Sequence, residues 1–136
     1  MLFLCTHNSA RSQIAEGLLR HLAGDRFEVM SAGTEATQVR PLTAKVMEEV
    51  EIDISGQESK TLDRYLGEPF DYVVTVCDEA NEACPFFPYA AERLHWSLPD
   101  PAAAQGTEEE RLEVFRSVRD RLRDRVEGEL VNGRVG

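Results

Sequence analysis

Short apolar runs alternate along the chain with stretches whose apolar residues recur at a helical spacing. The opening run, residues 1–5, is short and apolar, which predicts a buried strand that ends at Cys5. A helix is predicted from Ser12 to about Ala23, with Gly24 at its end. Its apolar residues recur at the 3.6-residue period, and they are Ile14, Leu18, Leu19 and Leu22.

The rest of the chain repeats this alternation. The run DYVVTV, residues 71–76, predicts a strand buried on both faces, because apolar and β-favouring residues follow one another. Two further strands are predicted at residues 27–31 and 94–97. Helices are predicted from Pro41, over residues 59–66, and from Thr107 to about Leu130. The apolar side of the last helix consists of Leu112, Phe115, Leu122, Val126 and Leu130.

Strands that alternate with helices predict right-handed β-α-β crossovers and a parallel sheet. The expected fold is therefore α/β: a small doubly wound sheet of four parallel strands with helices on both faces. One domain is expected over residues 1–136. Ligands of such sheets bind at the carboxyl ends of the strands. Cys5 and Cys77 end two predicted strands, and Asp100 follows a third, so all three are expected at one edge.

Composition and charge exclude several classes of protein. The formal net charge of −10 disfavours nucleic acid as a partner. No apolar run approaches the roughly 20 residues that a membrane helix needs, and the opening run is too short for a signal peptide. We therefore expect a cytoplasmic protein and, for this size, a monomer. The three cysteines are an odd number, which disfavours a disulfide framework.

The stretch CTHNSARS, residues 5–12, has the composition of an anion-binding loop between a strand and a helix. Successive peptide N–H groups can point inward there, next to the positive end of the helix dipole. Arg11 offers a planar fork for two oxygens of a tetrahedral oxyanion. The same donors favour the thiolate of Cys5, a nucleophile, and Ser12 can donate to it. The expected oxyanion-binding residues are Thr6, His7, Asn8, Ser9, Ala10, Arg11 and Ser12.

Two further cysteines widen the possible chemistry. Cys77 and Cys84 are separated by six residues, which is too wide for a zinc knuckle, and no second pair matches them. They are either buried small side chains or a redox pair on a polar loop. Asp100 precedes a proline, so it is either an ordinary turn residue or a general acid held in extended backbone.

The motifs together resemble a known family. The pattern C-x5-R-S is the signature of cysteine-dependent phosphatases, and CTHNSARSQIAEG resembles the start of the low-molecular-weight tyrosine phosphatase fold. The sequence is most similar to the branch of thioredoxin-coupled arsenate reductases. That branch shows the same order of motifs, and here they are SAGT at 31–34, DIS at 53–55, SK at 59–60, VVTVCDEANEACP at 73–85 and HWSLPDPA at 95–102. The resemblance covers nearly the whole chain.

The resemblance implies a reduction of arsenate to arsenite. Cys5 would attack arsenic with Asp100 as general acid, and a disulfide would pass from Cys5–Cys77 to Cys77–Cys84. Thioredoxin is the implied electron donor, with glutathione and glutaredoxin as the alternative, and phosphate and sulfate would mimic arsenate. No cofactor is implied. Some relatives bind potassium with a carboxylate where this chain has Lys60, so no metal site is expected.

Two other functions stay open at this point. The first is a low-molecular-weight phosphatase that hydrolyses small or tyrosine phosphomonoesters, and weak phosphatase activity is expected even in a reductase. Residues 102–104 are alanines where tyrosine phosphatases of this fold carry aromatic residues, which favours a small inorganic anion. The second is a redox- or oxyanion-sensing protein without turnover, and the presence of Cys5, Arg11, Ser12 and Asp100 argues against it.

Overall fold

The computed structural model describes residues 1–35, 37–65, 67–78 and 90–131. Four parallel strands form one sheet in the order β2-β1-β3-β4. Their bounds are Leu2–Cys5 for β1, Met30–Gly33 for β2, Phe70–Thr75 for β3 and Ala90–His95 for β4. The predicted α/β fold with a four-stranded parallel sheet is confirmed.

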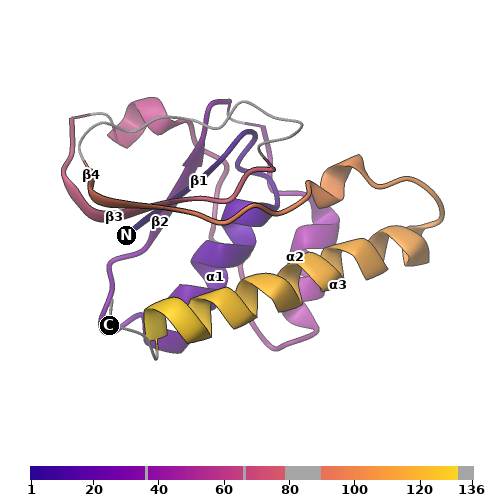
Figure 1. Cartoon of the computed structure of the whole chain (residues 1–136). Helices are drawn as coiled ribbons and strands as arrows, with labels where there is room; N and C mark the ends of the chain where they lie inside the picture. Colours follow the sequence, from indigo (N-terminus) through magenta and orange to yellow (C-terminus); the bar gives the residue numbers. More distant parts are fainter. Residues whose placement is uncertain (36, 66, 79–89, 132–136) are drawn as a thin grey trace.

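Both faces of the sheet are covered (Figure 1). Helices α1 (Arg11–Ala23), α2 (Pro41–Glu48) and α3 (Glu108–Arg125) lie on one side, and α3 continues into the π-helical turn η3 (Val126–Val131). The short 3₁₀ helix η1 (Leu62–Tyr65) lies on the other side. The predicted helix over residues 59–66 is thus one turn long.

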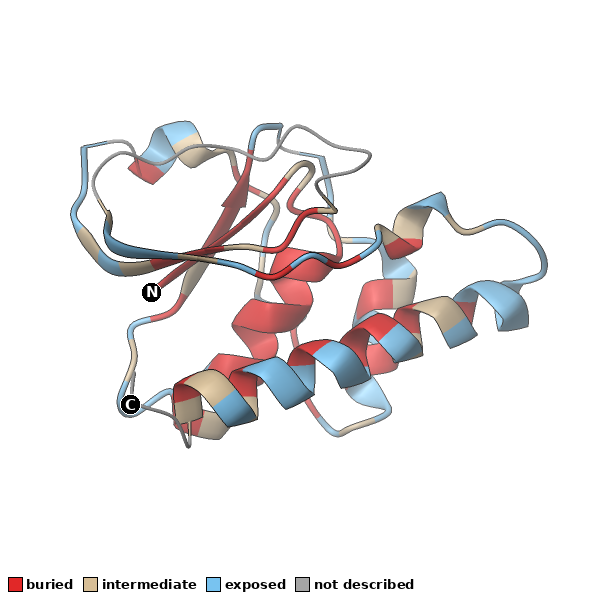
Figure 2. Ribbon diagram, in the orientation of Figure 1, coloured by how far each residue is buried: buried red, intermediate tan, exposed pale blue. Residues whose placement is uncertain are grey.

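The core is divided between these two faces because side chains alternate along each strand. Phe3 and Val74 point toward the helices and pack with Leu18 and Leu122 in one apolar cluster. Leu2, Leu4, Val73 and Tyr65 form a second cluster under η1. Strand β1 is therefore buried on both sides, and α3 buries only its inner face (Figure 2).

A proline, a capping threonine and a glycine mark three of the helix ends. Pro41 is the first residue of α2, as predicted, where its missing N–H costs nothing. Thr107 caps α3, and its Oγ1 accepts a hydrogen bond from the N–H of Glu110 at 3.2 Å. Gly24 follows α1 directly, and a Cβ there would lie 2.3 Å from the carbonyl oxygen of Arg20. Predicted and observed helix bounds agree within one residue at these positions.

Two strands lie a few residues from their predicted positions. Strand β2 begins at Met30 rather than at residue 27, because the N–H groups of Arg26 and Phe27 donate to the carbonyl of Ala23 and close the end of α1. Strand β4 runs from Ala90 to His95, so it begins four residues before the strand predicted at residues 94–97. It is one of the two edge strands, and its sequence AAERLH is largely exposed and mixes polar with apolar residues.

Candidate active site

The loop between β1 and α1 encloses the thiol of Cys5. Cys5 is the last residue of β1 and is 2% exposed. Its Sγ accepts a hydrogen bond from the N–H of Asn8 at 3.2 Å and lies 2.8 Å from Oγ of Ser12, in the first turn of α1. The thiol thus has donors on two sides, which is the surrounding that a thiolate needs.

The directions of the peptide N–H groups in this loop follow from the hydrogen bonds that its carbonyl oxygens accept. The carbonyl of Thr6 accepts from the N–H of Glu35, and that of His7 from the hydroxyl of Ser59. The carbonyl of Ser9 accepts from the hydroxyl of Thr43. In a trans peptide the N–H points opposite to the carbonyl, and no peptide here is cis. The following N–H groups therefore point away from these outer partners, and that of Asn8 indeed points at Cys5.

Asn8 holds the loop in shape from within. Its φ of 49° lies in the left-handed region, which asparagine tolerates better than most residues. Its Nδ2 donates to Oγ of Ser12 at 2.7 Å and to Oγ of Ser31 at 3.0 Å. Its Oδ1 accepts from Nε2 of Gln13 at 2.9 Å and from the N–H of Lys60 at 2.8 Å. Every hydrogen-bonding group of this side-chain amide is therefore satisfied.

These bonds also set the direction of the Ser12 hydroxyl. Oγ of Ser12 accepts a hydrogen from Asn8, so its own hydrogen remains for Sγ of Cys5. A hydroxyl that donates to sulfur favours the thiolate over the thiol. The sequence suggested a donating role for Ser12, and the bond from Asn8 supplies the reason for it.

Arg11 and Asp100 lie together at the mouth of the loop. Arg11 is 2% exposed, and its Nη1 donates to the carbonyl of Leu98 at 3.2 Å. Its Nη2 lies 3.9 Å from Oδ2 of Asp100. Asp100 caps the short 3₁₀ turn η2 (Pro101–Ala103), where Oδ1 accepts from the N–H of Ala102 at 3.0 Å. One carboxylate oxygen is fixed by the turn while the other faces the guanidinium.

His7 lies at the rim. Its Nδ1 is 3.2 Å from a carboxylate oxygen of Glu35, and both side chains are substantially exposed. Thr37 donates its hydroxyl to the carbonyl of His7, so it is the backbone of this residue that the loop holds in place. Within the expected oxyanion-binding set, His7 would contribute its peptide group, and its ring faces Glu35.

Two residues that support the loop were not singled out from the sequence. A Cβ on Gly33, at the end of β2, would come within 2.7 Å of the Thr6 carbonyl oxygen and 2.8 Å of the Asn8 nitrogen. Only glycine allows that approach. Ser31 joins the hydroxyl network that reaches Cys5 through Asn8. Both lie in the SAGT motif, residues 31–34. This motif contributes to the family resemblance, but the sequence alone indicates no role for either residue.

Lys60 is buried, and it belongs to a charged cluster behind the loop. Its Nζ donates to the carbonyl of Glu58 at 2.7 Å and lies 3.9 Å from Oε1 of Glu16. Burial lowers the pKa of Lys60, and the Glu16 carboxylate counters that effect. Arg20 pairs with the other oxygen of Glu16 at 2.7 Å. Within the described part of the chain, no three His, Cys, Asp or Glu side chains are grouped as metal ligands.

Cys77 lies at the same sheet edge as Cys5. The β1–β3 register pairs Leu4 with Thr75, and the N–H of Val76 donates to the carbonyl of Leu4. Cys77 follows directly and is fully buried, and both Cys5 and Cys77 are free thiols. Cys84 lies outside the described residues. The structure thus brings together Cys5, Arg11, Asp100 and one further thiol at the edge that the sequence predicted.

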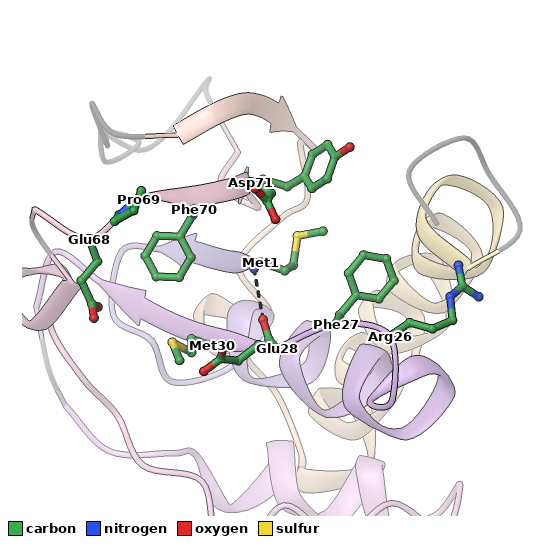
Figure 3. A pocket seen from close by; sticks show the side chains of 10 residues that line it. Met1, Arg26, Phe27, Glu28, Met30, Glu68, Pro69, Phe70 and Asp71 are labelled. Carbon is green, nitrogen blue, oxygen red and sulfur yellow. Dashed lines mark hydrogen bonds between the residues drawn. The ribbon is translucent and has the colours of Figure 1, made fainter.

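A hollow of about 430 Å³ lies at the opposite edge of the sheet, next to the starts of β1 and β3 (Figure 3). Glu28, Glu68 and Asp71 line it together with aromatic side chains. Burial lowers the pKa of the Met1 amino group, which donates to the carbonyl of Glu28 at 3.1 Å. Three carboxylates outnumber the positive groups of the lining, Arg26 and the Met1 amino group, which disfavours an oxyanion here and separates this hollow from the candidate active site. Among the described helices, none is both long and apolar enough to cross a membrane.

Comparisons with known proteins give one family. The model of the family "Low molecular weight phosphotyrosine protein phosphatase" matches residues 1–132. An arsenate reductase of Oceanobacillus iheyensis is 48% identical over 124 residues, which is 91% of this chain and 89% of that protein. A solved structure described as an arsenate reductase in the phosphate binding state is 35% identical and has a TM-score of 0.81, with 96% of this chain and 95% of that chain covered. A thioredoxin-dependent arsenate reductase of Corynebacterium glutamicum is 32% identical at a TM-score of 0.61, over 90% of this chain and 57% of that one.

Proposed function

The chain belongs to the low molecular weight phosphotyrosine protein phosphatase family, and from that premise we propose that it reduces arsenate to arsenite. One observation carries the proposal: a second free thiol, Cys77, is buried at the sheet edge where the loop encloses Cys5. A phosphatase needs one thiol, whereas a reduction by two electrons needs a pair of them. Relatives named arsenate reductase support the same conclusion.

Arsenate would bind in the loop as a tetrahedral oxyanion. Peptide N–H groups of residues 6–12 and the start of α1 supply partial positive charge, and the Arg11 guanidinium supplies a full one. A relative of known structure was described in a phosphate binding state, and phosphate has the same shape and charge pattern. We therefore propose phosphate and sulfate as competing mimics.

The proposed reaction begins at Cys5. Its thiolate attacks arsenic, an As–S bond forms, and a hydroxyl leaves as water with a proton from Asp100. Sulfur of Cys77, as thiolate, then attacks sulfur of Cys5. The As–S bond breaks, and its electron pair stays on arsenic, which becomes As(III) and leaves as arsenite. The two thiols have supplied the two electrons and form a Cys5–Cys77 disulfide.

Cys84 would regenerate the nucleophile. Its thiolate attacks Cys77, releases the Cys5 thiolate and leaves a Cys77–Cys84 disulfide for an external dithiol to reduce. We propose thioredoxin as that donor, since a complete pair of internal thiols suits a dithiol partner, and a relative carries "thioredoxin-dependent" in its name. Glutathione with glutaredoxin remains the competing donor. Free thiols also fit our proposal of a single-domain, monomeric protein in a reducing cytoplasm.

Hydrolysis of phosphomonoesters is the second candidate. Cys5, Arg11 and Asp100 are the groups that a phosphatase of this family would use, and they lie together. Residues 102–104, which follow Pro101, are alanines, so this segment offers no aromatic side chain to an aryl phosphate. We therefore propose phosphatase activity as a weak side reaction of the same loop.

Arsenite release distinguishes the two functions. With thioredoxin, thioredoxin reductase and NADPH, the wild-type protein should turn over repeatedly. Cys84→Ser should stop after one oxidation, with Cys5 and Cys77 joined in a disulfide that mass spectrometry detects. Cys5→Ser should form no arsenite at all. Hydrolysis of p-nitrophenyl phosphate by wild type and Cys84→Ser, without arsenite formation by either, would show a phosphatase instead.

A further inference from the structure

A second hollow, of about 290 Å³, is lined by residues at the starts of α2 and α3 and in the turn η2, beside the candidate active site. Figure 1 shows where these three elements lie. It shares no lining residue with the hollow at the opposite sheet edge. Its walls are largely apolar, formed by Pro41, Leu42, Pro101, Ala102 and Phe115. A volume of this size suits a small organic molecule.

Two arginines also line this hollow. Arg40 precedes α2, Arg111 lies in the first turn of α3, and both are exposed. Within the described part of the chain, neither guanidinium has an ion pair, although the protein has 25 acidic residues against 15 basic ones. Several other arginines pair with carboxylates, as Arg64 does with Glu58 and Arg116 with Glu49. Two guanidinium groups without a carboxylate partner among the described residues thus line one hollow of an acidic protein, and they are available for a ligand.

One carboxylate lines the hollow as well, but its charge is countered. A carboxylate oxygen of Glu108 lies 3.7 Å from Nζ of Lys45. The charges of that pair cancel, and those of Arg40 and Arg111 remain. Among the lining residues two arginines stand against one glutamate, so the lining carries a formal charge of +1 (2 − 1), against the −10 of the whole chain.

We propose that this hollow binds a small organic carboxylate with an apolar body. The apolar walls would bury the body, and the planar guanidinium groups would bind the carboxylate oxygens in pairs. Inorganic phosphate has no apolar body and therefore belongs in the loop around Cys5. This site is distinct from the proposed arsenate site and does not depend on it.

The hollow adjoins the backbone that holds the catalytic candidates. The N–H of Arg40 donates to the carbonyl of Ser9 in the anion-binding loop at 3.1 Å. Ala102, another lining residue, donates its N–H to Asp100. A bound carboxylate would lie against both segments without reaching Cys5.

Benzoate is a suitable probe, followed by amide NMR signals of Leu42, Ala102 and Ala104. We expect saturable shifts, unchanged by excess phosphate. Arg40→Gln and Arg111→Gln should each weaken binding about tenfold, because each removes a charge-assisted hydrogen bond. Arg121→Gln is the matched control, since it removes the same charge from an exposed position on α3 outside the hollow. Benzyl alcohol, which has the same ring without the charge, should bind at least about tenfold more weakly.

Three outcomes would overturn the proposal. Displacement of benzoate by phosphate would place it in the loop around Cys5. Equal weakening by Arg121→Gln would mean that only overall charge matters. Shifts that grow linearly with benzoate would mean that no site exists. None of these readouts requires turnover, so failure to reduce arsenate would leave this test intact. Melting temperatures would verify that the variants are folded.

Discussion

The hydroxyl of Ser12 is the side-chain donor that faces Sγ of Cys5, at 2.8 Å, and this contact supports a testable prediction. Ser12→Ala removes the donor and leaves Nδ2 of Asn8 without one of its acceptors. We expect alkylation of Cys5 by iodoacetamide at pH 7 to slow about tenfold, because a hydrogen bond to a charged group is worth roughly that factor. The rate is measured in a Cys77→Ser, Cys84→Ser background, in which Cys5 is the only thiol of the chain.

Ser117→Ala provides the control for that experiment. Ser117 lies on the exposed side of α3, far along the chain from the loop, and its replacement should leave the rate unchanged. Equal alkylation rates with Ser12 and with Ser12→Ala would mean that this hydroxyl does not stabilise the thiolate. The peptide N–H of Asn8 would then be the donor that matters.

At the scale of single residues, the sequence points to the proposed reacting groups but not to the residues that support them. Cys5 and Arg11 are close in sequence, so a short pattern reveals them. Asn8 and Lys60 are 52 positions apart, and their contact depends on how the whole chain folds. Gly33 is required by a backbone approach from the neighbouring loop, which no local pattern indicates.

At the scale of elements, α2 and α3 are joined by a charged cluster around Glu49. Arg116 and Arg119 bind its carboxylate, and Arg119 also donates to the carbonyl of Val46 at 2.8 Å. The hydrogen bond from Arg116 is the main cause that lowers the pKa of Glu49 to about 2. A depressed carboxyl pKa stabilises the fold above the unfolded value of 4.5 and loses that effect as the pH falls toward 2.

Glu49→Gln should therefore destabilise the protein at pH 7 by about 1–2 kcal/mol, a value reduced for solvent screening because the side chain is 32% exposed. Most of the difference should be gone at about pH 2.5, close to the folded pKa of about 2. Urea unfolding at both values of pH measures this difference in the free energy of unfolding between wild type and Glu49→Gln. Glu109→Gln removes a more exposed partner of Arg116 and should cost under about 0.5 kcal/mol. A Glu49→Gln difference that persists undiminished at about pH 2.5 would contradict the linkage.

The elements also show which sequence patterns are informative. Strands β1 and β3 lie inside the sheet, so uninterrupted apolar runs mark them well. Strands β2 and β4 lie at the edges, and their bounds differ from the predicted ones by several residues. Their sequences, MSAG and AAERLH, contain no uninterrupted run of large apolar residues, so they give a weaker pattern. Helix α3 was predicted closely because its buried residues recur over 18 positions.

At the scale of the whole molecule, an acidic chain is proposed to bind a doubly charged anion. The net charge of −10 repels phosphate at long range, while the peptide N–H groups and Arg11 attract it at contact distance. Salt screens the two effects unequally. The Debye length falls from about 30 Å at 0.01 M salt to about 8 Å at 0.15 M, whereas contacts inside a buried loop are screened much less.

Phosphate should consequently bind more tightly at 0.15 M NaCl than at 0.01 M, by about three- to tenfold, because the repulsion is screened and the contacts are not. Calorimetric titration measures the dissociation constant. A triple variant, Glu28→Gln, Glu68→Gln and Asp71→Asn, neutralises three charges at the sheet edge opposite to Cys5 and should show a smaller gain with salt. Weaker binding at high salt would contradict this account, since it would mean that a positive field extends beyond the loop and outweighs the charge of the whole chain.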